Sequence, residues 1–177
     1  TLHRSMIDGL AIAAAAGAEA WGVDTWAVDY GVLRDGRLVG PVRAYRDPRN
    51  ERGRGTLLGA LPWPDLYAIT GIQDILINTA YQVAADDPQR IVEGATFLLV
   101  PDLLSYWATG VMATDITNAS TTAMVDVRTR RWSSTVLSAL GVPASSFLVP
   151  DDPGSIRGTA VDPRLNGLPL IGVATHD

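Results

Sequence analysis

The sequence predicts an α/β fold with a mixed β-sheet. Apolar runs of strand length alternate with stretches of helix-forming residues, and several of the expected helices stop at a glycine. Asp35-Gly36 is a strong signal for an antiparallel hairpin. The length of 177 residues, 47% of them hydrophobic, corresponds to about one domain with a sizeable core.

The N-terminal part is expected to form a helix followed by a long strand. Residues 5–8, Ser-Met-Ile-Asp, resemble a capping box and predict a helix to about residue 16, which Gly17 ends. Residues 20–33 predict a strand, because apolar residues alternate along it. One face of that strand is expected to carry Trp26, Val28, Tyr30 and Val32.

The central part is expected to contain a hairpin, a loop and a short helix. Asp35-Gly36 predicts the hairpin turn, and residues 37–42 its returning strand. Residues 46–55 combine arginines with Asp, Glu, Pro and Gly and predict a solvated loop. Residues 57–70 contain two prolines and then a short helix that closes at Gly71.

The remaining elements follow from caps, prolines and apolar runs. Helices are predicted over residues 79–85, 101–109 and 133–140, and strands over residues 95–100 and 168–174. Gly110 and Gly141 are expected to end the second and third of these helices. The last strand is short and apolar, which is typical of a strand in the middle of a sheet.

Composition excludes several kinds of chemistry. The chain has no cysteine, so disulfides, thiolate metal sites and cysteine nucleophiles are excluded. All 14 basic residues are arginine, which excludes a phosphate-loop lysine and a Schiff base. The two histidines, His3 and His176, lie at opposite ends of the sequence, so we expect no histidine-rich metal cluster and assign no metal ligand.

Charge and hydropathy limit the expected partners. The formal net charge of -5 argues against nucleic acid. The longest apolar stretch, residues 9–18, is mostly alanine and is shorter than the roughly 20 residues that span a membrane. We therefore expect no membrane segment and a cytoplasmic location, and the oligomeric state stays open.

Asp177 is the first candidate for a functional residue. It follows the apolar run 168–174, and ligands gather outside the carboxyl ends of strands in open α/β sheets. A helix cap is the alternative role for this side chain. Because the chain begins at Thr1 and stops just after an apolar run, we expect it to be a piece of a longer polypeptide.

Trp26 and Ala27 form a second candidate site. An indole can cover the face of a sugar ring, and a small neighbour lets the ligand approach; a core position is the alternative for Trp26. Asp24 and Asp29 would lie on opposite faces of a continuous strand, so they are not expected to act as an acid/base pair. One of the two is expected to face a polar cleft.

Two further groups of polar residues are assigned no chemistry. The arginines at 43, 46, 49, 52 and 54 could contact phosphates or RNA, but the interleaved acids and the overall charge favour a solvated loop. The hydroxyls of Thr117, Ser120, Thr121 and Thr122 have no histidine near them in sequence, so no nucleophilic triad is expected.

Several segments, taken in order, resemble the FGGY family of carbohydrate kinases. They are Gly-Val-Asp-Thr-Trp-Ala-Val-Asp-Tyr at 22–30, Ala-Tyr-Arg-Asp at 44–47, residues 69–73 and 78–82, the Asp-x-x-x-Tyr-x-x-Thr-Gly pattern of 102–110, Thr-Asn-Ala-Ser-Thr-Thr at 117–122, Pro-Gly-x-x-Arg-Gly at 153–158, and Ala-Thr-His-Asp at 174–177. The first and last segments are most similar to family members that act on L-rhamnulose.

The resemblance implies an actin-like, ribonuclease-H-like fold and transfer of the ATP γ-phosphoryl group to the 1-hydroxyl of L-rhamnulose. By position, Asp177 matches the catalytic base and His176 a sugar contact. Ala27 stands where the family usually has a sugar-contacting glycine, and Thr25 and Trp26 flank that contact. The alternatives are a kinase for another ketose, such as L-fuculose, and a non-catalytic sugar-binding module.

The resemblance also places residues 1–177 within a larger protein. The family's phosphate-binding loop would precede Thr1 and its ATP-binding lobe would follow Asp177. We therefore expect part of the first, sugar-binding lobe, with ATP and Mg²⁺ bound mostly by other parts of the enzyme. The expected partners are a small-molecule ketose and ATP, and the fragment alone is expected to be inactive.

Overall fold

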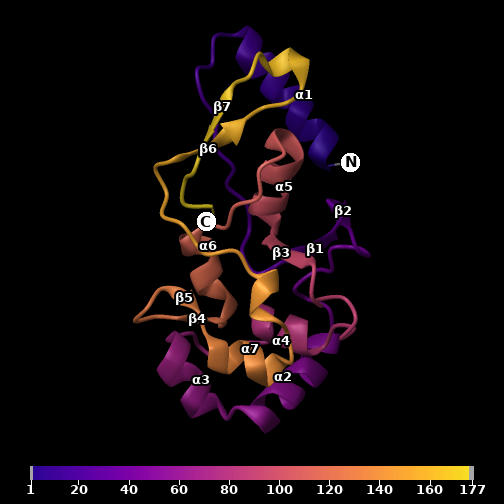
Figure 1. Ribbon diagram of the computed structural model, residues 1–177, viewed down its shortest axis with the longest axis vertical. Helices are drawn as coiled ribbons and strands as arrows, with labels where there is room; N and C mark the ends of the chain where they lie inside the picture. Colours follow the sequence, from indigo (N-terminus) through magenta and orange to yellow (C-terminus); the bar gives the residue numbers. More distant parts are fainter. Residues whose placement is uncertain (1, 176–177) are drawn as a thin grey trace.

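The computed structural model describes residues 2–175 as an elongated molecule (Figure 1). Its α-helices are α1 (Leu2–Ala15), α2 (Arg49–Ala60), α3 (Trp63–Thr70), α4 (Thr79–Ala84), α5 (Val100–Thr109), α6 (Ile116–Ala119) and α7 (Ser134–Leu140). Its strands are β1 (Tyr30–Arg34), β2 (Arg37–Leu38), β3 (Ala95–Leu99), β4 (Val125–Asp126), β5 (Arg131–Trp132), β6 (Ile156–Thr159) and β7 (Pro169–Ile171). Short 3-10 turns cover Ser120–Thr122, Ala144–Ser146 and Pro163–Leu165.

The central sheet has the order β2-β1-β3, and both pairings are antiparallel. Leu33 faces Leu38 across the Asp35-Gly36 turn, so the predicted hairpin is confirmed, although its returning strand is only two residues long. β4 and β5 form a second hairpin and a two-stranded sheet, and β6 and β7 form another two-stranded sheet. β4, β5 and β6 were not predicted. Isolated parallel bridges are also present, such as the one between Trp21 and Leu170. Parallel and antiparallel pairing therefore occur together, as predicted.

The predicted strand over residues 20–33 is wrong for most of its length. Only Tyr30–Arg34 is a strand, and the preceding residues form an irregular segment. The backbone turns at Val28, which has a φ of 70°, and the Asp29 N–H donates to the Ala27 carbonyl at 3.0 Å. A hydrogen bond between residues two apart closes a tight γ-turn, which interrupts the alternation of a strand.

The predicted loop over residues 46–55 is also wrong, because most of it lies in α2. This helix packs against α4, and a Cβ on Gly53 would lie 1.9 Å from the Tyr81 carbonyl oxygen. Arg49 and Arg52 donate to the carbonyls of Gln82 and Ala85 at the end of α4. Glycine and arginine residues suggest a loop when only the local sequence is considered. Here Gly53 permits the two helices to pack closely, and the two arginines satisfy carbonyls at the end of α4.

The predicted helix ends are confirmed at three glycines. Gly71, Gly110 and Gly141 end α3, α5 and α7 in the left-handed conformation, with φ between 67° and 75°. The side chain of Ser133 caps α7 by accepting from the Val136 N–H. The capping box at residues 5–8 is wrong, because α1 is already helical from Leu2.

The core consists of one cluster toward each end of the molecule and a smaller third cluster, in which Leu33 and Leu98 of the sheet pack against Leu103 of α5. At one end, β1 and β3 pack against α2, α3, α4 and α7. At the other end, α1 and α5 pack against β7, with Leu165 and Leu170 almost fully buried.

The strand predicted over residues 168–174 is present only as β7, Pro169–Ile171. It pairs with β6 on one side and with Trp21 on the other, which agrees with the predicted place between neighbouring chain segments.

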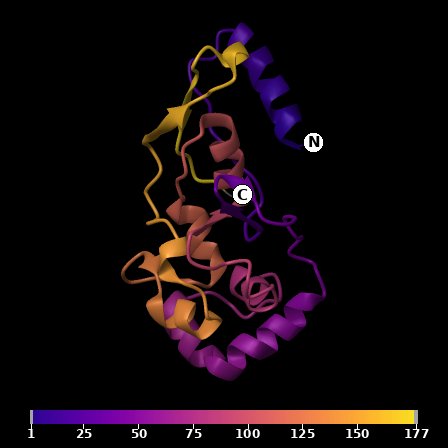
Figure 2. The same ribbon diagram turned by 45° about the vertical axis from the view of Figure 1, so that its right-hand side comes forward.

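A long irregular segment, residues 39–48, connects β2 to α2. In the turned view the segment before α2 runs along one side of the molecule (Figure 2). None of the helices described is long and apolar enough to cross a membrane.

Candidate functional site

The predicted site segment lines an open cavity. The cavity is lined by Trp26, Ala27 and Val28 together with Tyr45, Arg46 and Ile77. The cavity has a volume of about 470 Å³, which is enough for a small-molecule ligand. The exposed fraction of Trp26 is 40%, so the alternative reading of this residue as core is wrong.

The wall is shaped by the strained turn at Val28. A β-branched residue rarely adopts a positive φ, and such strain persists only where the surroundings hold it. Here α4 supplies the support, since Thr79 Oγ1 and Gln82 Nε2 donate to the Val28 carbonyl at 2.8 and 3.1 Å. Backbone strain of this kind is concentrated at functional sites.

Asp29 holds the indole of Trp26 in place. The Trp26 Nε1–H donates to Asp29 Oδ2 at 2.9 Å, and the carboxylate is 4% exposed. Burial raises the pKa of Asp29 above its ordinary 3.8, while the bond from the indole lowers it. Asp24, in contrast, is exposed. The predicted reason for their separation, opposite faces of a continuous strand, is wrong, because neither acid lies in a strand.

The structure brings the two ends of the predicted site together. The Thr25 N–H donates to the Thr175 carbonyl at 3.1 Å, although 150 positions separate them in sequence. Thr25 lines a second apolar cavity of about 360 Å³ with Trp26, between α1 and α5. His176 and Asp177, the predicted sugar contact and base, lie outside the described residues and follow Thr175 directly.

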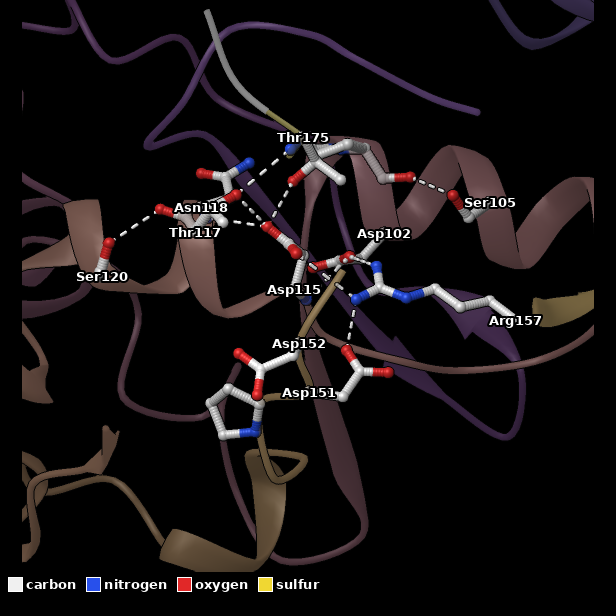
Figure 3. Close-up of polar contacts among 12 residues, drawn as sticks. Asp102, Ser105, Asp115, Thr117, Asn118, Ser120, Asp151, Asp152, Arg157 and Thr175 are labelled. Carbon is white, nitrogen blue, oxygen red and sulfur yellow. Dashed lines mark hydrogen bonds and ion pairs between the residues drawn. The ribbon is translucent and has the colours of Figure 1, made fainter. Parts of the chain in front are cut away.

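A buried cluster of charged residues lies beside Thr175, and sequence reasoning missed it (Figure 3). Arg157 Nη1 is 3.7 Å from Asp102 Oδ1, and Nη2 is 3.4 Å from Asp115 Oδ2; Nη2 also pairs with Asp151. Asp102 and Asp115 are almost fully buried. The segments that resemble the family did include residues 102, 117–122 and 157. Because these segments are far apart in sequence, the sequence did not indicate that they form one cluster.

Burial controls the electrostatics of this cluster. Burial raises the pKa of Asp102 well above 3.8; Arg157 opposes the shift and the Asp115 carboxylate adds to it. The pKa of Asp151 is raised by burial as well, against the attraction of Arg157. A single guanidinium faces three carboxyl groups and offsets only part of the cost of removing them from water, which is why the pKa values of Asp102 and Asp151 stay raised.

The described residues do not fit a magnesium site. Within residues 2–175, no group of three or more His, Asp or Glu side chains is arranged to hold a metal ion. The acids of the buried cluster already face Arg157 rather than an open coordination position.

The arginines assigned to a solvated loop have structural partners instead. Arg49 lies 3.4 Å from Asp86, Arg54 pairs with Asp74, and Arg52 donates to a helix carbonyl. The hydroxyls of the 117–122 segment also serve local structure. Thr117 donates to Asp115, and the hydroxyls of Ser120, Thr121 and Thr122 donate to backbone carbonyls.

Comparison with known proteins gives a family for this fold. Residues 7–151 match the N-terminal domain of the FGGY family of carbohydrate kinases. The chain is 38% identical over 153 residues to a rhamnulokinase from Enterobacter sp. (strain 638), covering 84% of the chain and 31% of that protein. It is 34% identical over 177 residues to a rhamnulokinase from Yersinia pestis (strain Pestoides F), covering 98% and 36%. The chain thus spans about a third of the length of these relatives.

Solved structures show the same fold. A xylulose kinase from Lactobacillus acidophilus superposes with a TM-score of 0.83 at 13% identity, covering 99% of this chain and 38% of that one. A Plasmodium falciparum glycerol kinase with ADP gives 0.80 at 16% identity, with coverage of 99% and 38%. The described chain therefore has the fold of the corresponding part of these kinases.

Proposed function

The chain belongs to the FGGY family of carbohydrate kinases, and from this membership we propose that it is part of the sugar-binding lobe of a kinase for L-rhamnulose. The reaction would move the γ-phosphoryl group of ATP to the 1-hydroxyl of the ketose. The observation that carries the proposal is the 34–38% identity to rhamnulokinases over most of the chain. We also propose a cytoplasmic location, where ATP is available.

The described residues would bind and orient the sugar. Trp26 offers an exposed ring face, fixed by Asp29, against which the apolar face of a sugar can stack. Ala27 and Val28 continue that wall, and Thr25 ties it to the segment that leads to His176. Holding the acceptor in one orientation removes part of the entropy cost of the transfer.

Asp177 would act as the general base. Its carboxylate would take the proton of the 1-hydroxyl while that oxygen forms a bond to the γ-phosphorus and the bond to the β,γ-bridging oxygen breaks, releasing ADP. Such a base contributes roughly 10²- to 10⁴-fold in rate. His176 would contact the sugar beside it. ATP with Mg²⁺ supplies the phosphoryl group, and we assign its binding to residues other than those described.

The test is a coupled kinase assay on the full-length protein that contains these residues, with a panel of ketoses. We expect turnover of L-rhamnulose, and a loss of at least about 100-fold in kcat for Asp177→Asn. Asp152→Asn, a change at an exposed aspartate paired with Arg130, is the matched control and should keep full activity.

Other outcomes would change or overturn the proposal. Turnover of L-fuculose or another ketose alone would keep the kinase reaction and implicate Ala27 in substrate choice. Full activity of Asp177→Asn would remove the base assignment. Sugar binding without turnover of any ketose would favour a non-catalytic sugar-binding module.

We further propose that residues 1–177 alone do not transfer phosphate. They span about a third of the length of the related kinases, so most of the machinery of those enzymes has no counterpart here. Sugar-dependent ATP turnover by the isolated chain would contradict this proposal.

A further inference from the structure

Thr175 is held on three sides by residues distant in sequence. Its N–H donates to Thr117 Oγ1 at 3.3 Å and its hydroxyl to Asp115 Oδ1 at 3.2 Å. Its carbonyl accepts from the Thr25 N–H at 3.1 Å. Thr175 is 3% exposed, and each of its polar groups has a partner within the protein. Figure 3 shows the bonds to Thr117 and Asp115.

Asp115 is the centre of this arrangement. It is fully buried and caps α6 by accepting from the Asn118 N–H at 3.1 Å, and it also accepts from the Thr117 hydroxyl. Its own N–H donates to Asp102 Oδ1 at 3.3 Å. A carboxylate with this many donors has one orientation, because any rotation would leave a buried donor without a partner.

Arg157 connects the cluster to the chain that leads to Thr175. A Cβ on Gly172 would lie 2.7 Å from Arg157 Nε and 3.1 Å from Cζ, so the guanidinium rests directly against the backbone at Gly172. The same guanidinium pairs with Asp115. The segment 172–175 is therefore fixed at both of its ends by one network of charged and hydroxyl groups.

We propose that Asp115 and Thr117 are positioning residues, which fix Thr175 and thereby place the carboxylate of Asp177 two residues further on. This inference rests on the proposed function, in which Asp177 is the base. Asp177 is the second residue after Thr175 in the sequence, so release of Thr175 would loosen the chain that carries the proposed base. A displacement of about 1 Å at a reacting group can cost on the order of 100-fold in rate.

The test uses Thr175→Val in the full-length protein, which removes the hydroxyl but keeps the shape of the side chain. We expect kcat to fall about 10- to 100-fold, with KM for the ketose within about twofold. Thr175→Ser restores the donor and should recover most of the activity. Thr70→Val is the matched control, because Thr70 is 4% exposed and its hydroxyl donates to Leu66 in α3. Thr70→Val should lower the free energy of unfolding about as much as Thr175→Val does, and it should leave kcat unchanged.

A second measurement tests the inference without activity. Amide hydrogen exchange of residues 172–177 should be at least about tenfold faster in Thr175→Val than in the wild type, and unchanged in Thr70→Val. Thr117→Val, which removes the acceptor of the Thr175 N–H, replaces Thr175→Val if that variant does not fold.

The outcomes separate the two proposals. A wild type that phosphorylates no ketose, with faster exchange in Thr175→Val, would remove the proposed function and leave the anchoring of Thr175 intact. Unchanged exchange would overturn the inference whatever the activity. Faster exchange with an unchanged kcat in an active enzyme would overturn it too, because Thr175 would then be held without positioning the base.

Discussion

At the scale of single residues, the site segment depends on conformations that neighbouring residues impose. Val28 has a positive φ because Thr79 and Gln82 hold its carbonyl, and Trp26 faces the cavity because Asp29 accepts from its indole. Local pattern alone favoured a straight strand here, since its apolar residues alternate. The energy that decides against the strand comes from α4, which lies about fifty positions further along the chain.

The first prediction concerns the exposed indole. In the full-length protein, Trp26→Ala should raise KM for the ketose about tenfold, equivalent to about 1.4 kcal/mol, with little change in kcat. The reason is that the ring would contact the sugar equally in the ground and transition states. Steady-state kinetics on wild type and variant measure both constants.

Trp63→Ala provides the control for that substitution. Trp63 is 38% exposed, against 40% for Trp26, and packs against Tyr67 on α3 rather than at the cavity. Its removal should leave KM unchanged. An equal rise of KM in both variants would show that Trp26 acts through general stability and not as a wall of the sugar site.

At the scale of elements, the fold depends on how closely α2 approaches α4. The glycines of α2 made this stretch resemble a loop, and one of them is what permits the contact. Gly53 faces the backbone of α4, whereas no atom lies within 4 Å of a Cβ placed on Gly55. At Gly53 packing requires glycine although alanine is the better helix former, whereas at Gly55 helix propensity alone decides.

The second prediction uses this difference. Gly55→Ala should stabilise the protein by up to about 1 kcal/mol, because alanine is the better helix former. Gly53→Ala should destabilise it by about 1–3 kcal/mol or more, since the methyl group would force the helices apart. Urea unfolding of the two variants measures both values. A stabilising Gly53→Ala would mean that α2 and α4 are not in close contact.

At the scale of the whole molecule, a buried network of charged groups connects β1, the end of α4 and the segment after the hairpin. Asp86, which follows α4, accepts from the Tyr30 hydroxyl at 2.7 Å and from Arg90 at 2.6 Å. Arg90 also donates to the carbonyls of Val39 and Pro41 in the segment after the hairpin. This network ties the central sheet to the chain that runs on to α2 (Figure 2).

The third prediction is the pH dependence of that network. Burial opposes ionisation of Asp86, but the Tyr30 hydroxyl and the Arg90 and Arg49 guanidinium groups bring its pKa below the ordinary 3.8. An acid with a lowered pKa stabilises the folded state above the unfolded pKa, and this contribution is lost as the pH falls through the folded pKa. Asp86→Asn should therefore cost about 3 kcal/mol at pH 7 and progressively less below about pH 4.

Denaturant unfolding of wild type and Asp86→Asn across this pH range checks the prediction. The two curves of unfolding free energy should approach each other as the pH falls. Asp152→Asn, at an exposed pair, should differ little from wild type at any pH. A loss for Asp86→Asn that stays the same from pH 7 down to about pH 2, below the folded pKa, would show that its charge does not stabilise the fold.

The sequence by itself determined the elements whose signals are local. The Asp35-Gly36 turn, the glycine stops at 71, 110 and 141, and the apolar run of β7 lie where they were predicted, because caps and turns depend on a few neighbouring residues. The resemblance likewise identified the family. Trp26 and Ala27, which it places at the sugar, line a cavity, and their contact with a sugar stays a proposal.

Only the tertiary structure decided the strained turn at Val28, the helix α2 and the cluster around Arg157. Each depends on partners from distant parts of the chain: α4 for the first two, and residues 102, 115 and 151 for the third. Free energy from such long-range contacts exceeds local propensity, which amounts to about 1 kcal/mol per residue. For that reason the pattern of residues 46–55 indicated a loop while the folded chain forms a helix.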